Sequence, residues 1–312
     1  MSFKQLVELA DMLDDGHVTG GDVVRYVQAQ GAVEGSSTTV KGVRGSTDFV
    51  KFLIPGKNGK RHGGSAPTFG IVGRLGGLGA RPERLGFTSD GDGALAAVTC
   101  AATLARGLNK GDQLEGDVIV GTHICPHAPT LPHKPVPFMD SPVTMDVLNQ
   151  FEIDPAMDAI LSIDTTKGNQ IICKSGISIS PTVLKGYILR VSEDLLNLMA
   201  ITTGKLPAAF PITQQDITPY GNGLYHMNSI LQPSVAADVP VVGLAITTET
   251  MVPGCATGAT HLVDVDDAVR YSVEVAKAFT QGVCSFYDRA EYERMENLYG
   301  SMSRFQTNGN LK

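Results

Sequence analysis

The sequence predicts an α/β fold with a mainly parallel central sheet, and two kinds of segment support this prediction. Three apolar runs, at 116–124, 156–166 and 239–248, lack a regular alternation of apolar and polar residues, which is typical of strands buried on both faces. Segments 93–108 and 264–279 have the apolar spacing of amphipathic helices. Because strands alternate with helices along the chain, we expect a parallel sheet covered by helices.

The N-terminal part of the chain supplies the other expected elements. Apolar spacing predicts helices over 3–14 and 20–30, separated by a turn-rich segment. Segments 37–43 and 48–56 have the composition of a strand pair. Segment 67–79 is an apolar run that breaks into glycines, which indicates a strand ending in a loop with unusual backbone angles.

Polar residues stand where the two long helices should begin. We expect Asp92 or Ser89 to cap the helix over 93–108, because their side chains can accept hydrogen bonds from the first turn. By the same argument, Asp264 or Asp266 should cap the closing helix.

The length and composition indicate a globular protein with one sizeable core. The chain has 312 residues, of which 42% are hydrophobic and 18% charged. We expect one α/β domain over 1–312, with N-terminal helices over 1–30 and a C-terminal helix and mobile tail over 286–312. Stable oligomers are common for such folds, so we expect a homo-oligomer.

The charge and the hydropathy of the sequence exclude two classes of partner. The formal net charge is −7 and the pI is about 5.5, without a block of like charges, so nucleic acid is not expected as a partner. The N-terminus reads as an acidic amphipathic helix rather than a signal peptide, and no apolar run approaches the length of a membrane span. We therefore expect a cytoplasmic protein that acts on a small molecule and does not bind a membrane.

The cysteines do not form a recognisable framework. The five cysteines are widely spread and include no CxxC pair, which argues against disulfides and against a zinc knuckle. Most are expected to be reduced thiols in the core. They are Cys100, Cys125, Cys173, Cys255 and Cys284.

The stretch GDVIVGTHICPHAP begins as a buried strand and ends in metal-ligand residue types. An extended chain would point His123, Cys125 and His127 to one face, since alternate residues of a strand share a face. Imidazole and thiolate suit zinc and similar ions, and His133 follows six residues after His127. Alternatively, Cys125 is a packed thiol and the two histidines bond to loop carbonyls.

Other polar residues follow the remaining strands. Asp164 ends an apolar strand, where a buried carboxylate needs a cation, a cap or water. Asp90 lies two residues before the expected cap Asp92 and has no such structural explanation. The loop rich in small residues after 239–248 carries Glu249, Cys255 and His261.

Several nucleotide and hydrolase motifs are absent from the sequence. The glycines at 73–79 lack the G-x-G-x-x-G spacing, and G-x-x-x-x-G-K-[ST] does not occur. No G-x-S-x-G elbow occurs either, which disfavours a serine hydrolase of the usual α/β type.

The order of these segments resembles the catalytic domain of the co-catalytic zinc aminopeptidases and carboxypeptidases. That resemblance implies a three-layer α/β/α sandwich with metal ions at the strand ends. SDGDGALAAVTCAATLA is similar to the family's opening of the Asp-bearing helix, with Asp90 at the metal-bridging aspartate. By the same resemblance, Asp164 and His261 match later metal ligands. THICPHAPT, GRLGGLGARP and VPGCATGATH resemble the domain of unknown function family 1177.

The sequence also departs from the peptidase pattern. Arg74 and Gly76 stand where that family has a histidine and an aspartate ligand. His123 and Ile124 stand nearest to its two glutamates, so the two-metal mechanism does not carry over intact.

One hypothesis is a metal-dependent hydrolase that cleaves an amide bond of a small peptide-like or acylated amino-acid substrate. It would hold one divalent metal, expected to be zinc, and Glu249 or His123 would act as the base. Arg74 would grip a substrate carboxylate, or alternatively pair with Asp90 or Asp164. The candidate metal ligands are Asp90, His123, Cys125, His127, Asp164 and His261, and the candidate substrate-binding residues are Arg74, Cys255 and His226.

The second hypothesis retains the fold without metal-dependent hydrolysis. Loss of the family's ligands is the expected trace of such a change, and Cys125 or Cys255 beside a histidine could support thiol chemistry. The protein would then be a metal-free ligand-binding protein, or a cysteine-dependent isomerase or racemase.

Overall fold

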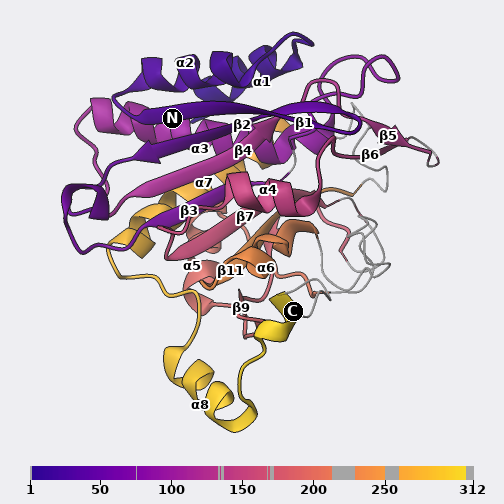
Figure 1. Ribbon diagram of the computed structural model, residues 1–312. Helices are drawn as coiled ribbons and strands as arrows, with labels where there is room; N and C mark the ends of the chain where they lie inside the picture. The colour runs from indigo at the N-terminus through magenta and orange to yellow at the C-terminus, as the bar shows by residue number, and fades with distance from the viewer. Residues whose placement is uncertain are drawn as a thin grey trace.

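The protein folds around a central sheet whose middle strands are parallel, as the computed structural model shows (Figure 1). The structure describes residues 2–74, 76–132, 134, 137–166, 168, 172–212, 229–249 and 260–306. The parallel strands are β3 (Phe69–Gly73), β4 (Val118–Ile124), β7 (Ala159–Thr166) and β11 (Val241–Thr247). The predicted α/β fold with a mainly parallel sheet is therefore confirmed.

Antiparallel strands extend the sheet at both sides. The first group is a hairpin of β1 (Glu34–Gly42) and β2 (Gly45–Ile54), and β2 pairs with β4. On the other side are β8 (Gly176–Ile179), β9 (Val183–Leu184) and β10 (Tyr187–Ile188). The strand order is β1-β2-β4-β3-β7-β11-β9-β10, with β8 paired to β11. A separate pair is formed by β5 (Thr130–Leu131) and β6 (Phe138–Met139).

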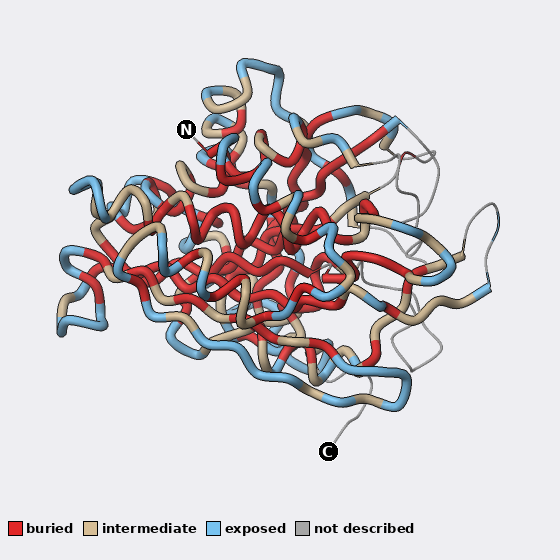
Figure 2. The backbone as a smooth tube through the Cα atoms, turned by 90° about the horizontal axis from the view of Figure 1, so that it is seen from above, coloured by how far each residue is buried: buried red, intermediate tan, exposed pale blue. Residues whose placement is uncertain are grey.

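Helices cover both faces of the sheet (Figure 1). One face carries α1 (Phe3–Asp14), α2 (Gly20–Gln30), α3 (Asp92–Asn109), α5 (Glu193–Thr203) and α7 (Leu262–Thr280). The opposite face carries α4 (Met145–Glu152) and α6 (Pro233–Ala236), and α8 (Arg289–Tyr299) follows α7. The buried residues, red in Figure 2, run through the strands and the helices packed on them. None of the helices in the described part of the chain is long and apolar enough to cross a membrane.

The observed first residues of α3 and α7 correct two predictions made from the sequence. The cap of α3 is Gly91, and Asp92 is the first helical residue, so neither Asp92 nor Ser89 is the cap. The cap of α7 is His261, without a side-chain hydrogen bond, and Asp264 lies inside the first turn. An aspartate in the first turn still interacts favourably with the positive end of the helix dipole, which explains why the sequence signal was displaced by a few residues.

The face of the sheet under α4 has an ordered row of side chains. Ile119, Gly121 and His123 alternate with residues of the main core, and they lie opposite Leu53, Lys51 and Phe49 of β2. Gly121 lies directly under the end of α4, because a Cβ there would come within 2.4 Å of the Glu152 carbonyl oxygen. This close approach fixes how far Glu152 can be from β4.

Replacing Gly121 with alanine is expected to push α4 away from the sheet. Gly121→Ala should lower the free energy of unfolding by about 1–3 kcal/mol, the usual cost of overpacking a tight contact. Gly21→Ala is the matched control, since the nearest atom to its Cβ would be 3.5 Å away. Urea unfolding of the wild type and both variants measures these changes. Equal stability of Gly121→Ala and the wild type would contradict the close approach of α4 to β4.

Candidate functional site

The carboxyl ends of the central parallel strands bring the candidate residues to one edge of the sheet. Arg74 directly follows β3, His123 lies near the end of β4, and Asp164 lies near the end of β7. Because β3 pairs with both β4 and β7 in parallel, the three positions are on neighbouring strands. Ligand groups of open α/β sheets gather at this edge.

A buried network of polar side chains joins Arg74 and His123 through Glu152 of α4. Arg74 Nη1 lies 2.6 Å from Glu152 Oε2, and His123 Nδ1 lies 2.6 Å from Glu152 Oε1. The exposed side-chain fractions are 2% for Arg74, 6% for His123 and 0% for Glu152. One carboxylate therefore holds a guanidinium with one oxygen and an imidazole with the other.

Helix α4 is held in place by contacts that position Glu152. Phe151 stacks on Phe49 of β2 with ring centroids 4.6 Å apart. Arg74 Nη1 also donates to Asn149 Oδ1 at 3.2 Å, and Arg74 Nη2 donates to the Met145 sulfur at 3.0 Å. Three residues of α4 thus contact the Arg74 guanidinium, so this arginine fixes both the position and the rotation of the helix.

The network determines the tautomer of His123. Since Glu152 is paired with Arg74 and accepts at Oε1, His123 Nδ1 carries the proton and donates it to Glu152. In the neutral imidazole, Nε2 is then the ring nitrogen with the lone pair, and no hydrogen bond to it is found within the described ranges. Gly76 borders this side of the ring, because a Cβ there would lie 2.5 Å from His123 Cδ2. A carboxylate-oriented imidazole of this kind can act as a general base.

The partner of Arg74 differs from both sequence hypotheses. Its guanidinium is buried against Glu152, so it pairs with neither Asp90 nor Asp164 and does not present a free fork to a substrate carboxylate. Its Nε is buried and has no hydrogen-bond partner among the described residues. Burial explains the outcome, because an arginine without a nearby carboxylate would be too costly there.

The predicted cluster of His123, Cys125 and His127 is separated into three environments. His123 contacts Glu152, the Cys125 sulfur donates to the Ser46 carbonyl, and His127 Nε2 bonds to the Gly16 carbonyl at 2.8 Å. This matches the alternative of a packed thiol for Cys125 and a histidine bonded to a loop carbonyl for His127. In the part of the chain that the structure describes, no group of three or more histidine, cysteine, aspartate or glutamate side chains could hold a metal ion.

The carboxylates at this edge receive hydrogen bonds from hydroxyl groups. Thr260 donates to Asp92 Oδ1 at 3.0 Å, and Thr165 lies 3.5 Å from Asp92 Oδ2. Asp164 accepts from the Thr165 amide at 2.6 Å and from the Ser229 hydroxyl at 3.1 Å. Together these contacts join the ends of β7 and the starts of α3 and α7 into a second polar group beside the Arg74 network.

The other predicted site residues make no hydrogen bond to Arg74, His123 or Glu152, or lie outside the described residues. Asp90 lies in the turn before α3, near Gly77, where an added Cβ would be 3.2 Å from its Oδ2. His261 and Glu249 are exposed, and the Glu249 carbonyl accepts from the Cys173 thiol at 3.9 Å. His133, His226 and Cys255 lie outside the described residues.

Sequence reasoning missed Glu152. It stands at the end of a short amphipathic helix, MDVLNQFE, where a glutamate is normally solvated. The sequence has no local signal that distinguishes Glu152 from the acidic residues near it on the surface. Only its complete burial against Arg74 and His123 marks it as a site residue.

A mainly parallel sheet between helices, with polar groups at the carboxyl ends of its strands, is the arrangement of an open α/β protein. The structure is similar to that of a leucine aminopeptidase mutant from tomato, with a TM-score of 0.52 and 11% identity. The match covers 88% of this chain and 61% of that chain, so this chain spans about three-fifths of the aminopeptidase. At this identity, the similarity shows the fold alone.

The chain belongs to the family described as protein of unknown function DUF1177, whose model matches residues 38–309. The resemblance seen in the sequence motifs is therefore confirmed, as is the peptidase-like core. No curated protein matches the sequence.

Removing the central carboxylate should destabilise the protein strongly. Glu152→Ala leaves Arg74 buried without its counter-charge, so we expect a loss of about 3–5 kcal/mol in the free energy of unfolding. Glu293→Ala removes an exposed pair with Arg289 and should cost less than about 1 kcal/mol. Chemical denaturation measures both, and similar values would show that the network is solvated in solution.

The Cys125 thiol should be inert in the native protein. Burial raises the pKa of Cys125 to about 11, so the thiol stays protonated at pH 8 and the nucleophilic thiolate is scarce. Iodoacetamide at pH 8 should modify the exposed Cys173 and leave Cys125 unmodified, as peptide mass spectrometry would show. Rapid labelling of Cys125 without unfolding would contradict this assignment.

Proposed function

We propose that this protein is a hydrolase that cleaves an amide bond of a small peptide-like or acylated amino-acid substrate at the edge that holds His123. The observation that carries the proposal is the imidazole of His123, oriented by the buried Glu152 carboxylate at 2.6 Å. The peptidase-like fold supports the same reaction class by analogy.

In the proposed reaction, His123 Nε2 removes a proton from water as the water oxygen attacks the amide carbonyl carbon. The tetrahedral intermediate then collapses, the C–N bond breaks, and the proton on Nε2 passes to the departing nitrogen. Glu152 stabilises the imidazolium that forms between these steps, because its Oε1 accepts from Nδ1. Arg74 is a positioning residue, since it holds the Glu152 carboxylate in place.

The metal-dependent form of this hypothesis fits the described residues poorly. Zinc would need several converging ligands, and no such group is found within the described ranges. No step of the proposed reaction therefore passes through a metal ion.

A metal-free ligand-binding protein is the second candidate function. The observation that favours it is the small accessible area of His123, whose side chain is only 6% exposed. The cysteine-dependent version is disfavoured for Cys125, because a thiol with a pKa of about 11 forms little of the nucleophilic thiolate near neutral pH.

The proposal is tested by removing Nε2 while keeping a donor to Glu152. His123→Asn places an amide nitrogen close to the position of Nδ1, so folding should be retained while hydrolysis falls by about 100-fold or more, as expected for loss of a general base. His127→Asn is the control, because His127 is exposed and its Nε2 bonds to the Gly16 carbonyl rather than to Glu152. Release of amine from dipeptides and N-acyl amino acids is the measurement.

Elemental analysis of protein purified without chelators accompanies this assay. A bound metal near one per chain, lost together with activity on chelation, would contradict the metal-free reaction. Equal rates for wild type and His123→Asn would contradict the role of His123.

A further inference from the structure

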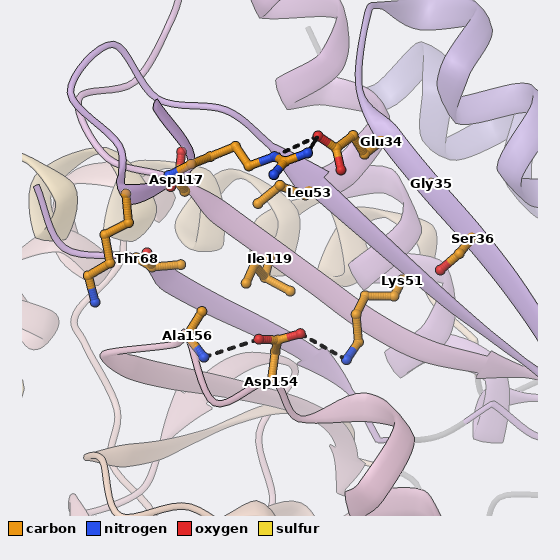
Figure 3. Close-up of a pocket in the computed structure, with 12 residues that line it drawn as sticks. Glu34, Gly35, Ser36, Lys51, Leu53, Thr68, Asp117, Ile119, Asp154 and Ala156 are labelled. Atoms are coloured by element: carbon orange, nitrogen blue, oxygen red, sulfur yellow. Dashed lines mark hydrogen bonds and ion pairs between the residues drawn. The ribbon is translucent and has the colours of Figure 1, made fainter. Parts of the chain in front are cut away.

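A pocket lies on the same face of the sheet as His123, toward the other end of β4. Its volume is about 530 Å³, within the range of small-molecule sites. Leu53 and Ile119, which are opposite each other on β2 and β4, form an apolar floor (Figure 3). Ala156, in the loop after α4, lies at one side of this floor.

Charged side chains surround the apolar floor in pairs of opposite sign. Lys51 Nζ lies 3.2 Å from Asp154 Oδ2, and Arg61 Nη2 lies 2.8 Å from Glu34 Oε1. All four side chains are partly exposed, and the Arg61 side chain is 54% exposed. Exposed pairs of this kind are weak, so a ligand with charges of its own can replace them at little cost.

Asp117 also lines the pocket, but both of its carboxylate oxygens accept hydrogen bonds from backbone amides. Its Oδ1 accepts from the Gly56 amide at 2.9 Å, and its Oδ2 accepts from the Arg61 amide at 2.8 Å. The charged side chains that can meet a ligand are therefore three cations, Lys51, Lys60 and Arg61, and two carboxylates, Glu34 and Asp154.

We propose that this pocket binds a small zwitterion with an apolar side chain, of the class of hydrophobic α-amino acids and dipeptides. The ligand carboxylate would pair with Lys51 or Arg61, and its ammonium group with Asp154 or Glu34. Its apolar side chain would lie on the floor residue Ile119. An uncharged apolar molecule would form no ion pair with the rim, and a simple anion would leave the floor uncovered.

The pocket touches the part of α4 that positions the candidate site. Lys51 Nζ donates to the Ile153 carbonyl at 3.2 Å, directly after Glu152. Ile119 is four residues before His123 on the same face of β4. Binding here requires no step of the proposed hydrolysis, so the two proposals stand or fall separately.

The test is calorimetric titration of the full chain with L-phenylalanine and with its uncharged analogue N-acetyl-L-phenylalanine amide. We expect the amino acid to bind and the analogue to bind at least about tenfold more weakly. Arg61→Ala should weaken amino-acid binding, and Ala156→Trp should block it by filling the pocket from an exposed position. Arg289→Ala, in an exposed pair on α8, is the matched control.

Three results would overturn the proposal. They are a wild type that does not bind L-phenylalanine, an uncharged analogue that binds equally well, and pocket variants that both bind as the wild type does. Binding lost in His123→Asn but kept in Ala156→Trp would place the ligand at the candidate site instead. Thermal unfolding checks that each variant is folded, and amide hydrolysis is scored separately, so loss of hydrolysis alone leaves this proposal standing.

Discussion

The buried Glu152 carboxylate is the constraint on which the candidate site depends. It is wholly removed from water, and its charge is balanced by Arg74 on one side while His123 donates to the other. A carboxylate in this position is stable only if both partners stay in place, because an unpaired buried charge costs several kcal/mol. The strand ends of β3 and β4 and the helix α4 are therefore locked together by one side chain.

The same helix connects the candidate site with the pocket over Leu53 and Ile119. Its end packs on Gly121, midway between Ile119 on the pocket floor and His123 in the network. Lys51 bonds to the carbonyl that follows Glu152, so the rim of the pocket and the network share a segment of backbone. A ligand that displaced Lys51 would break its hydrogen bond to the Ile153 carbonyl, next to Glu152.

The chain keeps a peptidase-like fold while the polar groups at its strand ends are arranged differently from the metal site that the sequence resemblance implies. Asp92 and Asp164 receive hydrogen bonds from Thr260 and Ser229, and Arg74 occupies the end of β3 with its own counter-ion. Fold similarity therefore does not carry the chemistry with it, and the site has to be argued from its own contacts.

The sequence by itself determined the fold class, the long helices and the buried strands. Apolar periodicity is local, so it located the helices over Phe3–Asp14 and Gly20–Gln30 and the buried strands β4, β7 and β11. Only the tertiary structure decided which side chains meet. Arg74 and Glu152 are 78 residues apart, and the choice of Glu152 over Asp90 or Asp164 depends on how α4 packs on β4, which no local pattern encodes.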